Sequence, residues 1–233
     1  MSDKQNIRVA TATHEQGYQG NDASFGQVDR EASLKVLRNT YMLLGMTLAF
    51  SALVATLGMA LRMPYMGLWM LVPYFGLLFA VEKTKNSSWG IVWVFALTGW
   101  LGLTLSPILS FYLGNIGYEP VLMALGATAL VFFASSAWVL STGKDLSFMT
   151  GFLMTGILVA FIAGIANVFL QISGLALAVS SMFALLSTGL MMWQTSQIIH
   201  GGETNYISAT VTLFVSIYNL FLSLLHLIGI GQE

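Results

Sequence analysis

The chain has 233 residues, of which 56% are hydrophobic and 8% are charged, whereas about 25% of the residues in an ordinary soluble domain are charged. Its formal net charge of −1 argues against nucleic-acid binding, which depends on a broad basic surface. The absence of cysteine excludes disulfides, thiolate metal ligands and cysteine nucleophiles.

The N-terminal segment, residues 1–35, is expected to be a disordered cytoplasmic tail. Up to about Arg30 it is rich in Gln, Asn, Asp, Ser, Thr and Gly and has almost no apolar periodicity. Such a segment cannot bury enough surface to offset the entropy lost on ordering. It also lacks the layout of a cleavable signal peptide, because the first apolar run begins only near Tyr41. Residues 36–233 are therefore predicted to form the folded domain.

This domain divides into runs that suit the hydrocarbon core of a bilayer, which is ~30 Å thick and takes about 20 apolar residues per helix. Seven spans are predicted, at residues 41–61, 66–81, 89–111, 121–141, 147–171, 174–197 and 206–230. The second is the shortest. Clusters of Gly, Pro, Ser, Asn and Asp that are typical of turns separate them. The predicted fold class is all-α, a polytopic membrane protein built as a bundle of seven transmembrane helices.

The basic residues predict the orientation, because cytoplasmic loops retain Lys and Arg more readily than loops that cross the membrane. With the N-terminus inside, Arg62 is the only one of the nine basic residues that falls outside. With seven spans, Glu233 then lies across the membrane from the N-terminus.

Two features of the fifth span are informative, a polar residue just before it and a row of small residues within it. Asp145 is interpreted as a cap in a cytoplasmic loop, because its side chain can accept hydrogen bonds from free backbone donors at the start of a helix. Gly156, Ala160 and Gly164 follow at four-residue steps. Small residues at this spacing allow a neighbouring helix to approach closely.

The seventh span carries polar residues at steps of three or four, which place them on one face of a helix. They are Asn205, Ser208, Thr212, Ser216, Asn219, Ser223 and His226. Unpaired polar groups that face lipid cost several kcal/mol each, so this stripe should face protein or enclosed water. The last helix is therefore predicted to be central in the bundle.

The stripe has two interpretations. The favoured one is that its side chains join helices by hydrogen bonds. The other is a hydrated ion or proton path, in which Ser216 and Asn219 would be joined by Gln194 and Asn167 from neighbouring spans. No Asp, Glu, Lys or Arg lies deep within a predicted span, and this argues against an active transporter.

The sequence predicts no catalytic machinery. Its histidines are His14, His200 and His226, and none of them is placed by the sequence beside a serine that it could activate. A His-Glu-x-x-His motif is absent, and His200 with Glu203 supplies only two possible zinc ligands. Asp145 is the only aspartate after residue 29, whereas an aspartyl protease needs two. We therefore expect no enzyme, no metal site and no other cofactor.

Several segments resemble the Bax inhibitor family over nearly the whole chain after residue 35. The strings are GLTLSPI at 102–108, KDLSF at 144–148, NVF at 167–169 and YNLF at 218–221. More narrowly, LRNTY at 37–41, ATALVFF at 127–133 and HGGETNY at 200–206 look like the YccA-like branch of bacterial members.

The resemblance implies a bacterial inner-membrane bundle whose last helix is enclosed by six others. It also implies a partner besides the membrane lipids, the membrane-bound ATP-dependent protease FtsH. Members of this branch modulate that protease and are slowly degraded by it, and a flexible N-terminal tail would give it an end to engage.

The resemblance also carries an alternative, because other family members are described as pH-sensitive calcium leak channels. A pair of membrane aspartates on the sixth and seventh helices gates them. The corresponding positions here are Gln194 and Ser216, and neither side chain titrates near neutral pH. A calcium or proton leak is therefore weakened as an interpretation of this chain.

Overall fold

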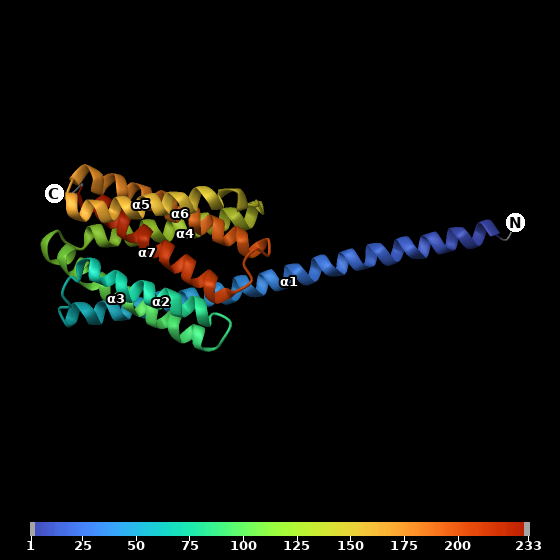
Figure 1. Ribbon diagram of the computed structural model, residues 1–233, viewed down its shortest axis with the longest axis horizontal. Helices are drawn as coiled ribbons and strands as arrows, with labels where there is room; N and C mark the ends of the chain where they lie inside the picture. The colour runs from blue at the N-terminus through green and yellow to red at the C-terminus, as the bar shows by residue number, and fades with distance from the viewer. Residues whose placement is uncertain (1–2, 231–233) are drawn as a thin grey trace.

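The computed structural model describes the backbone of residues 3–230 and the side chains of residues 30–230. Over this range the chain forms α-helices and two short 3₁₀-helices and no strand (Figure 1). In order they are α1 (Asp3–Ala60), η1 (Gly67–Met70), α2 (Leu71–Thr84), α3 (Trp89–Asn115), α4 (Glu119–Thr142), η2 (Ser147–Met149), α5 (Thr150–Leu170), α6 (Ser173–Ile199) and α7 (Tyr206–Ile230). The predicted all-α fold class is confirmed.

The tail predicted at residues 1–35 falls mostly on residues whose side chains lie outside the described part of the chain. The backbone of residues 3–35 belongs to the long first helix, α1. The disorder of this segment and the domain boundary after residue 35 stay predictions.

Six helical stretches within residues 30–230 are long and apolar enough to cross a membrane. They are Arg30–Ala60, Trp89–Asn115, Glu119–Thr142, Ser147–Leu170, Ser173–Ile199 and Tyr206–Ile230. The predicted second span, 66–81, corresponds instead to η1 followed by the 14-residue helix α2. At 1.5 Å per residue α2 is about 21 Å long, which is short of the ~30 Å core. Gly67, whose backbone is left-handed with φ of +57°, is the first residue of η1 and makes the start of this segment irregular.

The helices run back and forth along one axis, so their connections gather at two ends of the bundle (Figure 1). We call the end that holds residues 85–88, 143–146 and 200–205 the entry end, because α1 enters the bundle there. The far end holds residues 61–66, 116–118 and 171–172, together with the end of α7. Of the seven basic residues within 30–230, which are the nine of the chain less Lys4 and Arg8, six lie at or near the entry end and Arg62 lies at the far end.

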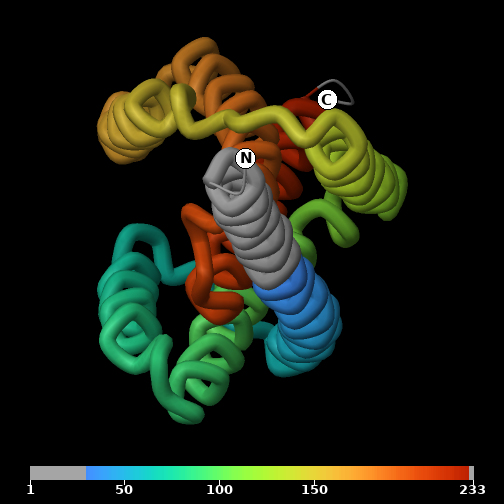
Figure 2. The backbone as a smooth tube through the Cα atoms, turned by 90° about the vertical axis from the view of Figure 1, so that its right-hand side faces the viewer, coloured from blue at the N-terminus to red at the C-terminus, as the bar shows by residue number. Residues whose placement is uncertain are grey.

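Helix α7 lies in the middle of the bundle (Figure 2). It packs against α1, α2, α3, α4 and α6, whereas α5 packs mainly against α6. Half of the most apolar stretch of α7 is buried, compared with 11% of that of the span that contains α5. The predicted central position of the last helix is confirmed, but five helices surround it closely rather than six, because α5 packs on α6.

The largest hydrophobic cluster joins α1 and α3 to α7. Leu213, Phe214 and Leu220 of α7 belong to it together with Leu44 of α1 and Leu97 of α3. All of these side chains are at most 3% exposed. The core of the bundle is therefore built around the last helix.

Candidate functional site

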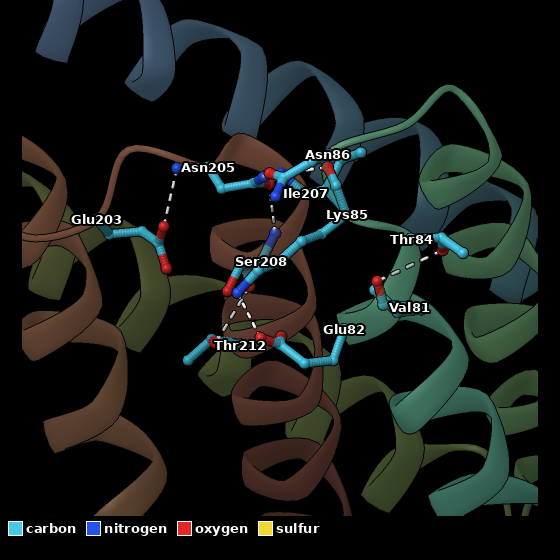
Figure 3. A network of polar contacts seen from close by, with 10 residues as sticks. All are labelled: Val81, Glu82, Thr84, Lys85, Asn86, Glu203, Asn205, Ile207, Ser208 and Thr212. Carbon is cyan, nitrogen blue, oxygen red and sulfur yellow. Dashed lines mark hydrogen bonds and ion pairs between the residues drawn. The ribbon is translucent and has the colours of Figure 1, made fainter.

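The N-terminus of α7 is held by one side chain, that of Asn205 (Figure 3). Its Oδ1 accepts hydrogen bonds from the backbone N–H groups of Ile207 at 2.9 Å and Ser208 at 3.2 Å, which is the geometry of a helix N-cap. Its Nδ2 donates to the carbonyl oxygen of Lys85 at 3.0 Å and to Oδ1 of Asn86 at 2.9 Å. The same side chain therefore starts the central helix and ties it to the connection between α2 and α3.

Two carboxylates complete this polar network. Glu203 accepts a hydrogen bond from the backbone N–H of Asn205 at 2.8 Å (Figure 3). Glu82 accepts a hydrogen bond from the Lys85 ammonium one helical turn away, and this contact raises the pKa of Lys85. The charges at this part of the entry end are thus paired locally or turned toward water.

The C-terminal turn of α6 holds the connection between α4 and η2. Ser196, which is fully buried, accepts a hydrogen bond from the backbone N–H of Leu146 at 2.9 Å and donates one to the carbonyl oxygen of Lys144 at 3.0 Å. Gln197 Nε2 donates to Ser147 Oγ at 2.9 Å. This loop clamp fixes residues 143–147 against the same end of α6 that leads into α7.

His200 adds two contacts to the loop clamp. Its Nδ1 lies 2.9 Å from the carbonyl oxygen of Ser196, and its Nε2 lies 3.1 Å from the carbonyl oxygen of Gly143. Carbonyl oxygens only accept, so the two hydrogen bonds form together only when both ring nitrogens carry a proton. A His200 ring with protons on both nitrogens therefore makes both hydrogen bonds, and a ring with one proton makes one of them.

Asp145 lies inside the clamped loop and organises it. Its Oδ1 accepts hydrogen bonds from the Ser147 hydroxyl at 2.6 Å and from the Ser147 backbone N–H at 2.9 Å. These two bonds, together with the nearby charge of His200, hold the pKa of Asp145 below its ordinary value of 3.8. The carboxylate holds the turn that precedes η2.

The middle of the bundle contains two of the predicted polar residues in buried positions. Ser216 is 1% exposed and donates a hydrogen bond to the carbonyl oxygen of Thr212, one turn earlier in α7, at 2.7 Å. Gln194 on α6 is 2% exposed, and its Nε2 has no hydrogen-bond partner among the described residues. Ser216 is thus satisfied within its own helix, whereas Gln194 retains a buried donor.

A cavity of about 360 Å³ lies between α3, α6 and α7 toward the far end. Asn219, Ser223 and His226 line it from α7, and Ser180 lines it from α6. The Ser180 hydroxyl lies 2.7 Å from Nδ1 of His226. This pair was missed by the sequence analysis, because its members are 46 residues apart and only the packing of α6 on α7 brings them together.

Asn167, the fourth predicted polar residue, has a different role in the structure. Its Oδ1 accepts a hydrogen bond from the backbone N–H of Ile172 at 3.2 Å, and its carbonyl oxygen accepts one from Gln171. These bonds close the end of α5, at the turn into α6. The structure therefore places Gln194 and Ser216 in the interior, Asn219 at the cavity and Asn167 at a helix end.

The residues at these places offer hydroxyl, amide and imidazole groups rather than charged ones. Between residues 30 and 230, no group of three or more His, Cys, Asp and Glu side chains could hold a metal ion. Four of the five carboxylates of this range, those of Glu82, Glu119, Asp145 and Glu203, lie at helix ends or in connections, and Glu31 lies within α1 before the predicted first span. The polar interior can bind water and join helices, and its part toward the far end can admit small polar molecules.

The fold and the polar residues together define an integral, multi-pass α-helical membrane protein with a buried last helix. A family model described as "Inhibitor of apoptosis-promoting Bax1" matches residues 34–233. The chain belongs to this family, the Bax inhibitor family, so the resemblance inferred from the sequence strings is confirmed.

Relatives match along nearly the whole chain. The chain is 55% identical over 200 residues to the "Modulator of FtsH protease YccA" of Escherichia coli (strain K12), covering 85% of this chain and 91% of that protein. It is 52% identical over 219 residues to the "Uncharacterized protein PA2604" of Pseudomonas aeruginosa, covering 93% of this chain and 97% of that protein. An equally similar protein of another Escherichia coli strain is called "Inner membrane protein YccA". The narrower resemblance to the YccA-like branch is confirmed.

Proposed function

We propose that this chain is a modulator and slow substrate of an FtsH-type ATP-dependent protease in a bacterial inner membrane. The observation that carries this proposal is the 55% identity to the Escherichia coli modulator of FtsH, which extends over 91% of that protein. The proposed action is non-catalytic, because the chain would act by occupying the protease.

The packing of the chain supports slow degradation. A protease that pulls from the N-terminus must first remove α1, which packs against α3, α6 and α7. It must then separate α7 from the partners of Asn205 and α6 from the loop that Ser196 holds. Each step exposes backbone and polar groups that water and lipid satisfy less well than the bundle does. A substrate that resists extraction in this way occupies the protease and delays its other substrates.

Co-purification and turnover test the proposal. We expect the full chain to co-purify from membranes in mild detergent with a protease-inactive FtsH. Deletion of residues 1–30 should lengthen the lifetime of the chain and speed the turnover of a second FtsH substrate, because the protease would lose the end that it engages. Absence of co-purification, with unchanged turnover of both proteins after the deletion, would reject the modulator function.

An ion leak is the second candidate function, and the cavity lined by Asn219 and His226 favours it. The residues that match the gating carboxylates of other family members, Gln194 and Ser216, speak against it. Liposomes that contain the purified chain should be assayed for calcium and proton flux from about pH 5 to about pH 8, where near-neutral groups titrate. A flux that Asn219→Leu abolishes would support the leak, and absence of flux at every pH would exclude it.

A further inference from the structure

An apolar groove lies between α1 and α4, with a cavity volume of about 560 Å³. Residues from Tyr41 to Thr56 of α1 form one wall, and residues from Val121 to Phe133 of α4 form the other. The floor comes from α3 and α7. The groove exists because α1 and α4 each pack against α7 and make little contact with each other along most of their length. From Tyr41 to Thr56 it is about 22 Å long, at 1.5 Å per residue.

The entry end of the groove is closed. The Tyr41 hydroxyl donates a hydrogen bond to Ser136 Oγ at 2.8 Å, and the rings of Tyr41 and Phe132 lie 5.7 Å apart. These contacts bridge α1 and α4. Below the bridge, Gly45 is exposed and has open space around the position where a side chain would begin. The groove is therefore accessible from the lipid side but not from the entry end.

The walls of the groove suit hydrocarbon. The hydroxyls of Thr56 and Thr128 donate to carbonyl oxygens of their own helices, and that of Tyr218 is hydrogen-bonded to Thr104. Together with Tyr41, these polar groups are already satisfied by the protein, and most of the remaining lining is Leu, Ala, Ile, Val and Phe. Water or an ion would find few free partners in such a wall.

The surroundings of the groove indicate its occupant. Extended acyl chains are abundant in the bilayer around the bundle, and they match the apolar lining that α1 and α4 present.

Arg62 lies beyond the far end of the same wall in an unusual backbone conformation. Its N–H bonds to the carbonyl oxygen of Met59, and the N–H of Met63 bonds to that of Gly58, both at 3.0 Å. This pattern is a Schellman motif, whose left-handed residue is usually glycine. Here Arg62 occupies it with φ of +52°. Such a position costs a side chain some strain, so a function of the guanidinium would explain its presence.

The place and charge of Arg62 point to an anion. It is exposed, and it forms no salt bridge with a described residue. Among residues 30–230 it is the basic residue that departs from the clustering of Lys and Arg at the entry end. It lies two residues beyond the end of α1 at Ala60, at the far end of the helix that forms one wall of the groove. A guanidinium there is suited to a phosphate at the level of the lipid headgroups.

We propose that this groove is a phospholipid-binding site that holds one acyl chain between α1 and α4, with the lipid phosphate on Arg62. The lipid comes from the leaflet at the far end of the bundle. The chain of the lipid fills the gap that the separate packing of α1 and α4 on α7 leaves open.

Native mass spectrometry of the full chain tests this site. The protein is reconstituted in nanodiscs that contain phosphatidylglycerol, released into mild detergent and weighed. We expect one retained phosphatidylglycerol on the wild-type chain. Gly45→Leu should abolish this adduct because its side chain enters the groove. The matched control Gly76→Leu should retain it, because Gly76 is also an exposed helical glycine with open space but lies on α2, away from the groove.

Arg62→Gly separates the role of the charge from that of the fold. Glycine suits the left-handed position, so the melting temperature of this variant should not fall. Its retention of phosphatidylglycerol should drop about tenfold, as expected for the loss of one hydrogen-bonded charge pair. The wild-type chain should retain diacylglycerol with the same acyl chains as weakly as Arg62→Gly retains phosphatidylglycerol, because diacylglycerol has no phosphate.

Four results would overturn the proposal. They are a wild-type spectrum without a lipid adduct, equal retention by Gly45→Leu and Gly76→Leu, equal retention by the wild-type chain and Arg62→Gly, and a second protein chain bound in place of lipid.

Discussion

At the scale of single residues, Asn205 combines two tasks that usually need separate side chains. Its oxygen caps α7, and its nitrogen binds the connection between α2 and α3, which lies 119 or 120 residues earlier in the chain. An amide can do both because it carries an acceptor and two donors on one planar group.

Asn205→Ala should lower the free energy of unfolding by about 2 kcal/mol, because a cap and two cross-loop bonds are lost together. Equilibrium unfolding in mixed micelles measures this value. Asn205→Asp is the matched control, since its carboxylate keeps the cap but cannot donate to Lys85. It should lose a smaller amount, and equal losses for the two variants would show that the cap contributes nothing.

Asp145 makes the loop clamp sensitive to acid. Its pKa is held below 3.8 in the folded protein by hydrogen bonds from Ser147, so the carboxylate stabilises the fold above that pH. This stabilisation is lost as the pH falls below 3.8 through the lowered pKa. Melting temperatures measured from about pH 3 to about pH 6 should therefore fall more steeply toward acid in the wild-type chain than in Asp145→Asn. Parallel curves for the two proteins would contradict this assignment.

At the scale of helices, α1 and α3 pack closely because glycines remove side chains between them. A Cβ at Gly102 would collide with the backbone carbonyl oxygen of Ser51, and one at Gly58 would collide with the Ser106 hydroxyl. Ser106 uses this proximity to donate a hydrogen bond to the carbonyl oxygen of Ala55 at 3.0 Å. The pair is joined by backbone contact and a side-chain bond at the same place.

Gly102→Ala should destabilise the protein by about 1 to 3 kcal/mol, because a backbone oxygen cannot move aside as a side chain can. Gly126→Ala is the matched control, since nothing lies within 4 Å of a Cβ at that helical position. Its helix propensity alone predicts a gain of about 0.5 to 1 kcal/mol. Equal effects of the two substitutions in an unfolding assay would exclude close packing at Gly102.

The same helices show what a hydropathy pattern can predict. The seventh span, 206–230, was predicted with the bounds that α7 has in the structure, because an apolar helix ends where polar turn residues begin. The bounds of the second span, 66–81, were not predicted correctly, because composition does not reveal that residues 67–70 form a 3₁₀ turn before a short helix. The polar face of α7 was predicted from its period, whereas Ser180, the partner of His226, was not.

At the scale of the whole molecule, the packing of α1, α2, α3, α4 and α6 depends on α7, which contacts all five. It contributes thirteen buried residues, more than any other helix of the described chain. The helices around it expose large apolar side chains to the membrane, as Leu185, Leu130 and Phe169 show with more than 70% of each accessible. The same substitution should therefore change the free energy of unfolding much more in α7 than on the lipid-facing surface.

Leu213→Ala should cost about 2 to 5 kcal/mol, because Leu213 is fully buried at the centre of the bundle and its loss leaves a cavity. Leu185→Ala should have little effect, since that side chain is 76% exposed and lipid replaces it. Unfolding of both variants in the same micelles measures the difference. A loss of similar size for both would contradict the central position of α7.

The sequence by itself determined the class of this protein, its family, the central place of its last helix and most of its span boundaries. These properties depend on local composition and helical period, which a single chain carries in its order of residues. Only the tertiary structure decided that α5 packs behind α6, that Asn205 reaches Lys85 and that a groove opens between α1 and α4. These features depend on which helices pack together, and apolar helices of similar composition do not encode that choice in their hydropathy.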